Sequence, residues 1–492
     1  MTTGQRNSSH LAYKSLDDAP LNSKHWLTVI TAGMGFFTDA YDLFIIGTVT
    51  AILTPIWHLS TAQLSLLNSI SLIAAVVGAL TFGKLMDIFG RKAVYGIEVM
   101  LLVLGAVASA FSPNFAVLFA FRVLVGIGVG GDYATSAVIT SEYANRKNRG
   151  RLVGTVFAMQ GFGLLGGPAV AAILLGAGMS HALAWRLMLG LGAIPAASVI
   201  YLRRKIKETP RYTLAVKGDV ATTIETAAWV TGATPAVQAN GLATGSLAKQ
   251  GSSNGTSESR GATIRPLRYR LTDSPFLLRL LGTAGTWFLM DIAFYGNSVS
   301  SPLILKALQP KATLLDNILI AGAIFAVFAV PGYWVAVWLM DKIGRKRIQW
   351  QGFLVMALAF GAIAVIPGMA KNPWAFLLVF GISYFFIEFG PNETTFVFPS
   401  EVFPTSIRGA GDGISAAGGK TGAFLGALFV PTLLKTIHLS GTMGIMAAVS
   451  VIGFLLTVVA LPEPRGRSLE EASAETIESP GSVEPHPQAV GS

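Results

Sequence analysis

The sequence has no cysteine and few charged residues, and each shortage excludes a class of protein. Without cysteine, its 492 residues can form no disulfide, no thiolate nucleophile and no cysteine-based metal site. Charged residues make up only 13% of the chain and hydrophobic residues 52%, whereas soluble domains are about 25% charged. The composition therefore predicts an all-α membrane protein. The first 25 residues are polar, so we expect no cleavable signal peptide.

Long apolar stretches recur along the chain. A helix needs roughly 20 apolar residues to cross a bilayer. On that criterion the sequence predicts twelve transmembrane helices, at about 26–53, 63–86, 93–112, 114–141, 150–177, 184–206, 276–304, 315–340, 347–367, 373–400, 409–434 and 440–461. The 54 glycines suit helices that pack closely within a membrane.

A charged loop pattern occurs twice. Residues 87–92 read D-I-F-G-R-K and residues 341–346 read D-K-I-G-R-K, and each is followed by a glutamate seven positions before an Arg-Gly pair. Recurrence in the same order indicates a duplicated unit, here two pseudo-symmetric six-helix halves of the kind that build transporters. We expect the repeated charges to form cytoplasmic gates and helix caps. They are Asp87, Arg91, Glu142, Arg149, Asp341, Arg345, Glu401 and Arg408.

Basic residues concentrate in alternate loops. On one side lie Lys84, Arg91, Lys92, Arg146, Lys147, Arg149, Arg151, Arg203, Arg204, Lys205, Lys207, Lys342, Arg345, Lys346, Arg347 and Arg408. The loops of the other side hold Lys306, Lys311, Lys371 and Lys435. This asymmetry is the positive-inside pattern, and it predicts that both termini are cytoplasmic. It also accounts for the net charge of +10 without a nucleic-acid partner.

Polar segments divide the chain into parts. We expect a cytoplasmic N-terminal segment (1–25), one six-helix half (26–206), a second half (276–461) and a cytoplasmic tail (462–492). The linker between the halves (207–275) is rich in Gly, Ser and Thr in its middle, and it is predicted to be largely disordered with one short helix. The acidic, proline-rich tail is predicted to be disordered as well.

Ionisable side chains within the predicted spans are candidates for function, because a bilayer makes them costly. They are Asp39, Asp42, Glu98, Arg122, Asp132, Arg186, Asp291, Glu388, Glu393 and Lys420. At about 1.5 Å per helical residue, several polar residues lie about 14–18 Å from the loop charges: Asp132, Gln160, Asp291, Asn392 and Lys420. Asp39 lies about 20 Å away. Residues of six spans thus meet near the middle of the bilayer, where transporters place their substrate site.

Two carboxyl groups beside an ammonium group suit an anion that is transported together with protons. Asp39 and Asp291 occupy corresponding places in the two halves. Lys420 offers three donors and a charge to an oxyanion, and a carboxyl group buried there can take up and release protons. The alternative is that Lys420 and an aspartate only neutralise each other as a structural pair.

Two patterns that look like nucleotide-binding motifs are rejected. Residues 126–131 fit G-x-G-x-x-G but lie inside a predicted span, and residues 413–421 resemble a P-loop whose spacing is one residue too long. The sequence also has no pattern of a nucleophile with its base or of a metal cluster. It therefore predicts a transporter driven by an ion gradient, with no enzymatic activity, cofactor or metal.

Several motifs resemble those of the major facilitator superfamily over about residues 26–465. They include G-x-x-x-D-x-x-G-R-K (83–92), R-x-x-x-G-x-G (122–128), E-T-P-R-Y (208–212) and P-E-P-R-G-R (462–467). Further clusters resemble the phosphate:proton symporter family within it: D-A-Y-D (39–42), G-G-D-Y (130–133), W-x-x-x-D-x-x-x-Y (287–295), G-P-N (390–392) and S-A-A-G-G-K (415–420).

This resemblance implies the major facilitator fold and the import of inorganic phosphate with protons by alternating access. We expect a monomer in the cell (plasma or inner) membrane. The implied phosphate contacts are Tyr133, Gln160, Trp287, Asp291, Tyr295, Asn392 and Lys420. The implied proton-handling residues are Asp39, Asp42, Glu98 and Asp132. Arg122 is expected to be a charge partner or a hinge element rather than a ligand.

Departures from the family pattern keep a second hypothesis open. Ala134 replaces a proline, Glu393 stands where a small hydroxyl residue is usual, and Glu388 is an additional buried acid. Because extra negative charge opposes anion binding, a proton symporter for an organic anion, such as an aromatic or dicarboxylic acid, is the alternative. A nutrient sensor without transport activity is a third hypothesis, which the intact set of acids disfavours. The roles of Glu388 and Glu393 stay open.

Overall fold

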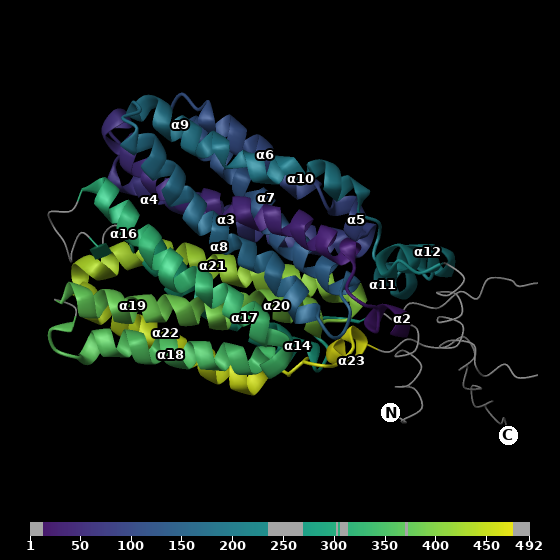
Figure 1. The fold of residues 1–492 in the computed structure, drawn as a ribbon. Coiled ribbons are helices and arrows are strands. Elements are labelled where there is room, and N and C mark those ends of the chain that lie inside the picture. Colours follow the sequence, from purple (N-terminus) through teal and green to yellow (C-terminus); the bar gives the residue numbers. More distant parts are fainter. Residues whose placement is uncertain (1–12, 235–268, 302–303, 306–312, 370–371, 476–492) are drawn as a thin grey trace, which may run out of the picture.

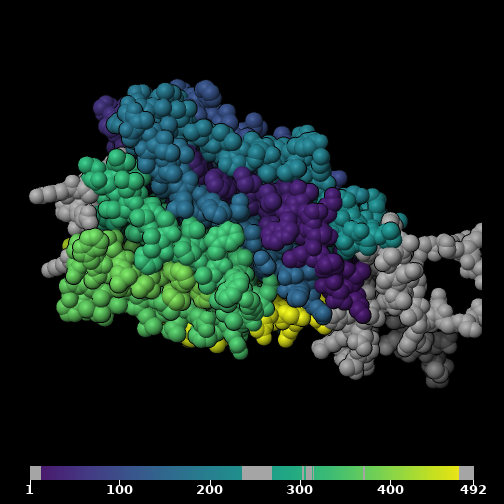
Figure 2. All heavy atoms as spheres, viewed as in Figure 1, coloured from purple at the N-terminus to yellow at the C-terminus, as the bar shows by residue number. Residues whose placement is uncertain are grey.

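Two bundles of long helices lie side by side in the computed structural model (Figure 1). The structure describes residues 13–234, 269–301, 304–305, 313–369 and 372–475. Within these ranges, twelve helices are long and apolar enough to cross a membrane. The predicted all-α, twelve-span architecture is therefore confirmed. In Figure 2 the N-terminal half, purple to teal, lies along the C-terminal half, green to yellow.

Each half contains six spans, some of them interrupted. The N-terminal half consists of α3 (Ser23–Trp57), α4 (Thr61–Phe89), α5 and α6 (Arg91–Val94 and Ile97–Ala110), α7 (Phe115–Tyr143), α8 (Arg149–Gly176), and α9 and α10 (His181–Leu191 and Ala193–Lys205). The C-terminal half consists of α14 (Phe276–Val299), α16, η1 and α17 (Leu314–Ile324, Phe325–Ala329 and Val330–Ile343), α18 (Arg345–Val365), α19, η3 and α20 (Pro373–Ile387, Glu388–Asn392 and Glu393–Val402), η4 and α21 (Thr405–Ile407 and Arg408–Thr436), and α22 (His438–Ala460). Here η1 and η3 are π-helical turns within long spans.

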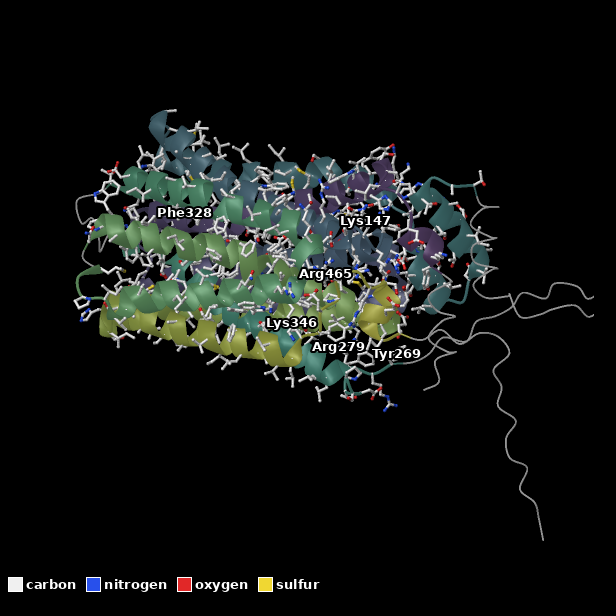
Figure 3. The ribbon with its side chains drawn as sticks, turned by 60° about the horizontal axis from the view of Figure 1, so that its bottom comes forward. Lys147, Tyr269, Arg279, Phe328, Lys346 and Arg465 are labelled. Atoms are coloured by element: carbon white, nitrogen blue, oxygen red, sulfur yellow. The ribbon has the colours of Figure 1, made fainter. Side chains whose placement is uncertain are left out.

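The outside of the bundle is apolar, as a lipid-facing surface must be. Val365 is 76% exposed, Val459 74% and Ile173 68%. Such a surface is unfavourable in water and favourable against acyl chains. In Figure 3, Lys147, Arg279, Lys346 and Arg465 all lie toward one end of the bundle, whereas Phe328 lies toward the other.

The two halves meet through corresponding pairs of helices. α21 packs against α4, and α8 packs against α17 and α16. Glycine permits the close approach of α4 and α21, because a β-carbon on Gly83 would lie 2.9 Å from the Cα of Gly413. A larger residue at Gly83 would force these helices apart, and with them the two halves.

The glycine of each repeated loop pattern makes a sharp turn at a helix end. Gly90 (φ 106°) ends α4 and Gly344 (φ 100°) ends α17, in a region of backbone conformation that favours glycine. A side chain would also collide with a carboxylate, that of Glu208 at Gly90 and that of Glu463 at Gly344. Each carboxylate accepts a hydrogen bond of 3.1 Å from the backbone N–H of the residue after the glycine.

Short helices gather at one end of the bundle, which we call the linker end. They are α2 (Lys14–Asp17), α11 (Pro210–Ala215), α12 (Val220–Thr231) and α23 (Leu469–Ser473). The described start of the linker thus holds two helices, where the sequence predicted one. Both have capped N-termini, by Thr209 and Asp219, and both bury apolar side chains. The predicted disordered parts, 235–268 of the linker and 476–492 of the tail, lie outside the described residues.

Candidate functional site

A lysine–aspartate pair lies buried between the two halves. Lys420 of α21 and Asp291 of α14 are each 1% exposed, with 3.6 Å between Nζ and Oδ2. That distance is too long for a hydrogen bond. Among the described residues, Lys420 Nζ donates one hydrogen bond, 3.2 Å long, to the Tyr295 hydroxyl. An ammonium group has three donors, so Lys420 has donors left for an anion.

Aromatic rings from both halves surround this ammonium group. Lys420 Nζ lies 3.9 Å from the centre of the Tyr133 ring and 4.8 Å from that of Tyr295, within the range of cation–π contacts. Tyr133 in turn packs against Trp287, with ring centres 5.9 Å apart. The sequence predicted these three aromatic residues as substrate contacts, and the structure brings them together around Lys420.

Aromatic contacts between the halves also lie on both sides of this pair along the bundle. Toward the linker end, Phe396 of α20 contacts Phe36 at 4.9 Å and Phe157 at 4.7 Å between ring centres. Toward the opposite end, Phe44 of α3 stacks on Tyr295 at 6.0 Å. The buried pair is thereby covered on both sides.

A chain of hydrogen bonds connects the two halves beside Tyr133. Gln160 of α8 donates from Nε2 to the Tyr133 hydroxyl at 3.0 Å, and its Oε1 accepts from the Tyr333 hydroxyl of α17 at 3.1 Å. Asn392 donates from Nδ2 to the Tyr333 hydroxyl at 3.0 Å and also to the Glu388 carboxylate. The predicted contacts Gln160 and Asn392 are thus linked through Tyr333, which the sequence did not single out.

Asp39 of α3 is fully buried and lacks a partner. Its side chain is 0% exposed, and neither carboxylate oxygen has a hydrogen-bond partner among the described residues. It lies within electrostatic range of Asp132, Arg203 and Lys420. An unpaired buried carboxyl group is costly as an anion, so this group suits a proton carrier.

Asp132 and Glu98 share one arginine, and this corrects the sequence interpretation of Arg203. Arg203 Nη1 lies 2.8 Å from Asp132 Oδ1 and 3.0 Å from Glu98 Oε1, and Ser136 donates to Asp132 at 2.7 Å. The prediction that Arg203 is a loop charge is wrong, because Arg203 is 2% exposed and faces the interior from the last turn of α10. The physical reason is that two buried carboxylates need a cation.

Asp42 forms an ion pair instead of standing alone. Arg122 Nη1 of α7 lies 2.6 Å from Asp42 Oδ1 of α3, and both side chains are buried. Arg122 is therefore a charge partner, one of the two roles expected for it. Because Arg122 stabilises the charged form of Asp42, Asp42 is less suited to carry a proton than the unpaired Asp39.

At the linker end, the repeated charges form two matching clusters. In the Glu142 cluster (Asp87, Arg91, Glu142 and Arg408), the Glu142 carboxylate binds Arg91 of its own half at 3.0 Å and Arg408 of the other half at 2.8 Å. Asp87 accepts from the backbone N–H groups of Gly409 and Ala410, at 3.0 and 2.7 Å. A carboxylate at a helix N-terminus is favourable, so Asp87 caps α21 across the interface.

The second cluster repeats this arrangement with the halves exchanged. In the Glu401 cluster (Asp341, Arg345, Glu401 and Arg149), Glu401 binds Arg345 at 2.8 Å and Arg149 of the other half at 2.8 Å. Asp341 accepts from the backbone N–H groups at the start of α8, at 3.0 and 2.8 Å. All eight predicted loop charges thus belong to the two clusters that tie the halves together, Arg345 by binding Asp341 and Glu401 of its own half.

The termini and linker add a third contact at this end. Arg211 of α11 binds Asp17 of α2 at 2.6 Å and Glu470 of α23 at 2.8 Å. Burial raises the pKa of Asp17 to about 6, an effect that the Arg211 guanidinium partly offsets. Burial also raises the pKa of Glu208, the carboxylate beside Gly90. No group of acidic or histidine side chains within the described ranges could hold a metal ion.

Known proteins resemble this chain in fold and in sequence. The model of the family named sugar (and other) transporter matches residues 26–475. The major facilitator superfamily proton:xylose symporter XylE, bound to 6-bromo-6-deoxy-D-glucose, superposes with a TM-score of 0.78, at 20% identity, over 92% of this chain and 99% of its own. The inward-open form of XylE from E. coli superposes with a TM-score of 0.63, at 21% identity, over 92% and 99%. These likenesses concern the fold.

Closer relatives in sequence are plant transporters. Low affinity inorganic phosphate transporter 8 of Medicago truncatula is 38% identical, over 95% of this chain and 94% of its own length. Inorganic phosphate transporter 1-4 of Arabidopsis thaliana is 37% identical, over 95% and 96%. This chain belongs to the inorganic phosphate transporter family of the major facilitator superfamily. As a member of that family it is a multi-pass membrane transporter and not an enzyme, as the sequence predicted.

The predicted residues of this family member fall into three groups in space. The substrate-contact candidates surround Lys420 or join the hydrogen-bond chain beside it, the remaining predicted site acids other than Asp39 have arginine partners, and Asp39, Glu388 and Glu393 have no basic partner among the described residues. The sequence missed Tyr333, Arg203 and the ring of Phe396. A tyrosine or phenylalanine in an apolar span gives no signal of its own, whereas Arg203 offered one, because it lies within the predicted span 184–206.

Proposed function

We propose that this transporter imports inorganic phosphate together with protons. One observation carries the proposal: the buried Lys420 holds a positive charge and unused donors between the two halves, beside hydroxyl and amide groups of both. A phosphate monoanion offers oxygens that accept such bonds. The names of the relatives, which are inorganic phosphate transporters, support phosphate over an organic anion.

The binding residues come from both halves. Lys420 supplies the charge, while Tyr133, Gln160, Tyr295 and Asn392 supply donors, and the indole N–H of Trp287 supplies another. Asp291, 3.6 Å from Lys420, neutralises the ammonium group before the anion arrives.

Alternating access follows from the clusters at the linker end. The bonds of Glu142 to Arg408 and of Glu401 to Arg149 join the halves, so they exist only while this end is closed. Rocking the halves apart here breaks both bonds and opens the site toward the linker end. Because Lys147, Arg279, Lys346 and Arg465 all lie at this end (Figure 3), the positive-inside pattern supports a cytoplasmic linker end and cytoplasmic termini.

Protons couple to this movement through the unpaired acid of α3. Asp39 has no cation of its own, whereas Asp132 and Glu98 share Arg203. A proton on Asp39 neutralises it in the loaded state, and its release allows Asp39 to compete with Asp132 for Arg203. We assign the protein to the cell membrane, acting as a monomer with one site between its halves.

Uptake of labelled phosphate into proteoliposomes tests this function. With an imposed pH gradient, acidic outside, the protein is expected to accumulate phosphate, and a protonophore is expected to abolish the accumulation. Excess unlabelled benzoate or succinate is expected to leave uptake unchanged. Strong competition by either anion would favour the organic-anion alternative, and no accumulation of phosphate or of those anions would refute proton-coupled transport.

A further inference from the structure

Away from the linker-end clusters, some buried carboxyl groups have no basic partner. Asp42, Glu98, Asp132 and Asp291 each contact Arg122, Arg203 or Lys420. Asp39, Glu388 and Glu393 are all 0% exposed and form no ion pair with a described residue. Asp39 is the proposed proton carrier of the N-terminal half, whereas the two glutamates of the C-terminal half have no assigned function.

Glu388 lies where the tenth span departs from regular helix. It is the first residue of the π-helical turn η3, in which Gly390 has non-helical angles (φ −101°, ψ −112°). Such turns inside α-helices often occur at functional sites. The turn places the Glu388 side chain beside that of Asn392, four residues later, and Asn392 Nδ2 donates to Glu388 Oε2. The other oxygen, Oε1, has no partner among the described residues.

The surroundings of Glu388 contain no compensating charge. The titratable groups that face it are Asp291 of α14, Tyr333 of α17, Tyr384 of α19 and Glu393 of α20. Each of these is an acid or a phenol. The Asn392 amide, assisted by the Tyr333 hydroxyl, is therefore the principal group that stabilises a negative charge on Glu388.

Asn392 is also a donor that the proposed substrate requires. Its amide group has two hydrogens, and both are used in the absence of substrate, one by Glu388 and one by the Tyr333 hydroxyl. If phosphate accepts the hydrogen that Asn392 now gives to Glu388, the Glu388 carboxylate loses that donor, and taking up a proton removes the charge that the donor stabilised. Binding of the anion and protonation of this carboxyl group are thus linked through one side chain.

We propose that Glu388 is a second proton-coupling carboxyl group, which takes up a proton when phosphate engages Asn392 and releases it when phosphate leaves. The proton comes from water on the outer side and bonds to a Glu388 oxygen, and on the cytoplasmic side it returns to water. The inference rests on the proposed phosphate transport and adds a proton to that of Asp39. Two protons with one dihydrogen phosphate ion carry one net positive charge inward.

Glu393 is the matched control. It lies five residues after Glu388 in the same span and is equally buried, but neither of its oxygens has a hydrogen-bond partner among the described residues. One of its oxygens lies against Gly154 of α8, near the side chains of Val337 and Met340, and Glu393 accepts no hydrogen bond from Asn392 or Tyr333. With no donor that substrate could remove, Glu393 stays protonated throughout the cycle.

The test compares wild type, Glu388→Gln and Glu393→Gln in proteoliposomes held at −100 mV inside by a potassium–valinomycin gradient, without a pH gradient. One charge moving through 100 mV is worth about 2.3 kcal/mol, or about 45-fold accumulation. Wild type and Glu393→Gln are expected to approach that ratio. Glu388→Gln is expected to lose the voltage-driven accumulation while it still exchanges internal for external phosphate and still responds to a pH gradient.

The outcomes separate the inference from the function on which it rests. Voltage-driven accumulation by Glu388→Gln equal to wild type would overturn the role of Glu388, as would electroneutral uptake by wild type. Loss of phosphate exchange in Glu388→Gln would make Glu388 a binding residue and would also overturn it. Failure of wild type to transport phosphate at all would instead refute the proposed function.

Proton uptake on phosphate binding by purified wild type in detergent provides a second measurement, and a value of one proton or fewer would contradict two coupled carboxyl groups.

Discussion

Replacing Glu142 by glutamine is expected to release one of the two clusters that close the linker end. Glu142 bonds Arg408 across the halves at 2.8 Å, and both side chains are fully buried. A hydrogen bond to a charged group is worth about 1.5–3 kcal/mol. Since each 1.4 kcal/mol is a factor of ten, the population open at this end should rise by about 10- to 150-fold. The Glu401 cluster keeps its bond to Arg149 and still joins the halves, so the increase in the open population stays within this range.

The absence of cysteine provides the assay for this change. Ser400 of α20 is fully buried, and its backbone carbonyl accepts a hydrogen bond of 3.1 Å from the Ser141 hydroxyl of α7, in the other half. It lies one helical turn after Phe396, on the helix face that meets the N-terminal half. A Ser400→Cys variant should react with an impermeant maleimide only when the linker end opens. The labelling rate, measured in vesicles with that end facing the reagent, should rise by the same 10- to 150-fold factor when Glu142→Gln is added.

The exposed pair of Lys207 and Glu225 provides the control. These side chains are 34% and 67% exposed, and an exposed ion pair contributes little. Glu225→Gln should therefore leave the labelling rate unchanged. Equal rates with and without Glu142→Gln would refute the view that this cluster holds the linker end closed, and so would an equal increase in Glu225→Gln.

Three further predictions concern buried charges. Asp39→Asn should lose accumulation of phosphate against its gradient but retain exchange, which needs no net proton movement, and unchanged accumulation would remove Asp39 from proton coupling. Arg203→Ala leaves two buried carboxylates unpaired and should destabilise the protein by about 3–5 kcal/mol in thermal unfolding, whereas the exposed Arg204→Ala should change little, and equal effects would contradict the pairing. The pKa of Asp17 is about 6 when α2 is docked and about 3.9 when it is free, so the docked form binds more protons and docking should weaken as the pH rises from about 4 to 6. Hydrogen exchange of residues 14–17 should report this loss, and Asp17→Asn should abolish the pH dependence. A pH-independent signal in wild type would argue against it.

The twelve spans and the two halves could be predicted because their signals are periodic and local. Runs of apolar residues mark each helix, and the D-x-x-G-R-K pattern marks the duplication without any knowledge of contacts. The repeat also pointed to the right partners at the linker end: Glu142 and Glu401 are related by sequence and occupy equivalent places in the structure.

The pairing of buried charges could not be predicted in the same way. Depth along a helix places Asp132 and Asp39 at similar levels, but it does not give the direction in which each side chain points. Asp132 turned out to face Arg203, at the far end of the same half in sequence, whereas Asp39 faces no cation. The sequence predicted one helix in the linker instead of two. The two helices are stabilised by packing against α2 and α7, and the composition of the linker contains no information about these contacts.

The substrate role of Lys420 is tested most directly by labelled phosphate uptake with an imposed pH gradient in Lys420→Ala and Asp291→Asn. Lys435→Ala is the control, because Lys435 lies on the same helix, α21, but is exposed near its end. All three variants should insert and fold, as judged by gel filtration. Uptake should be abolished in the first two variants and should match wild type in the control. Uptake above half of the wild-type rate in either Lys420→Ala or Asp291→Asn would contradict a phosphate site built on this buried pair.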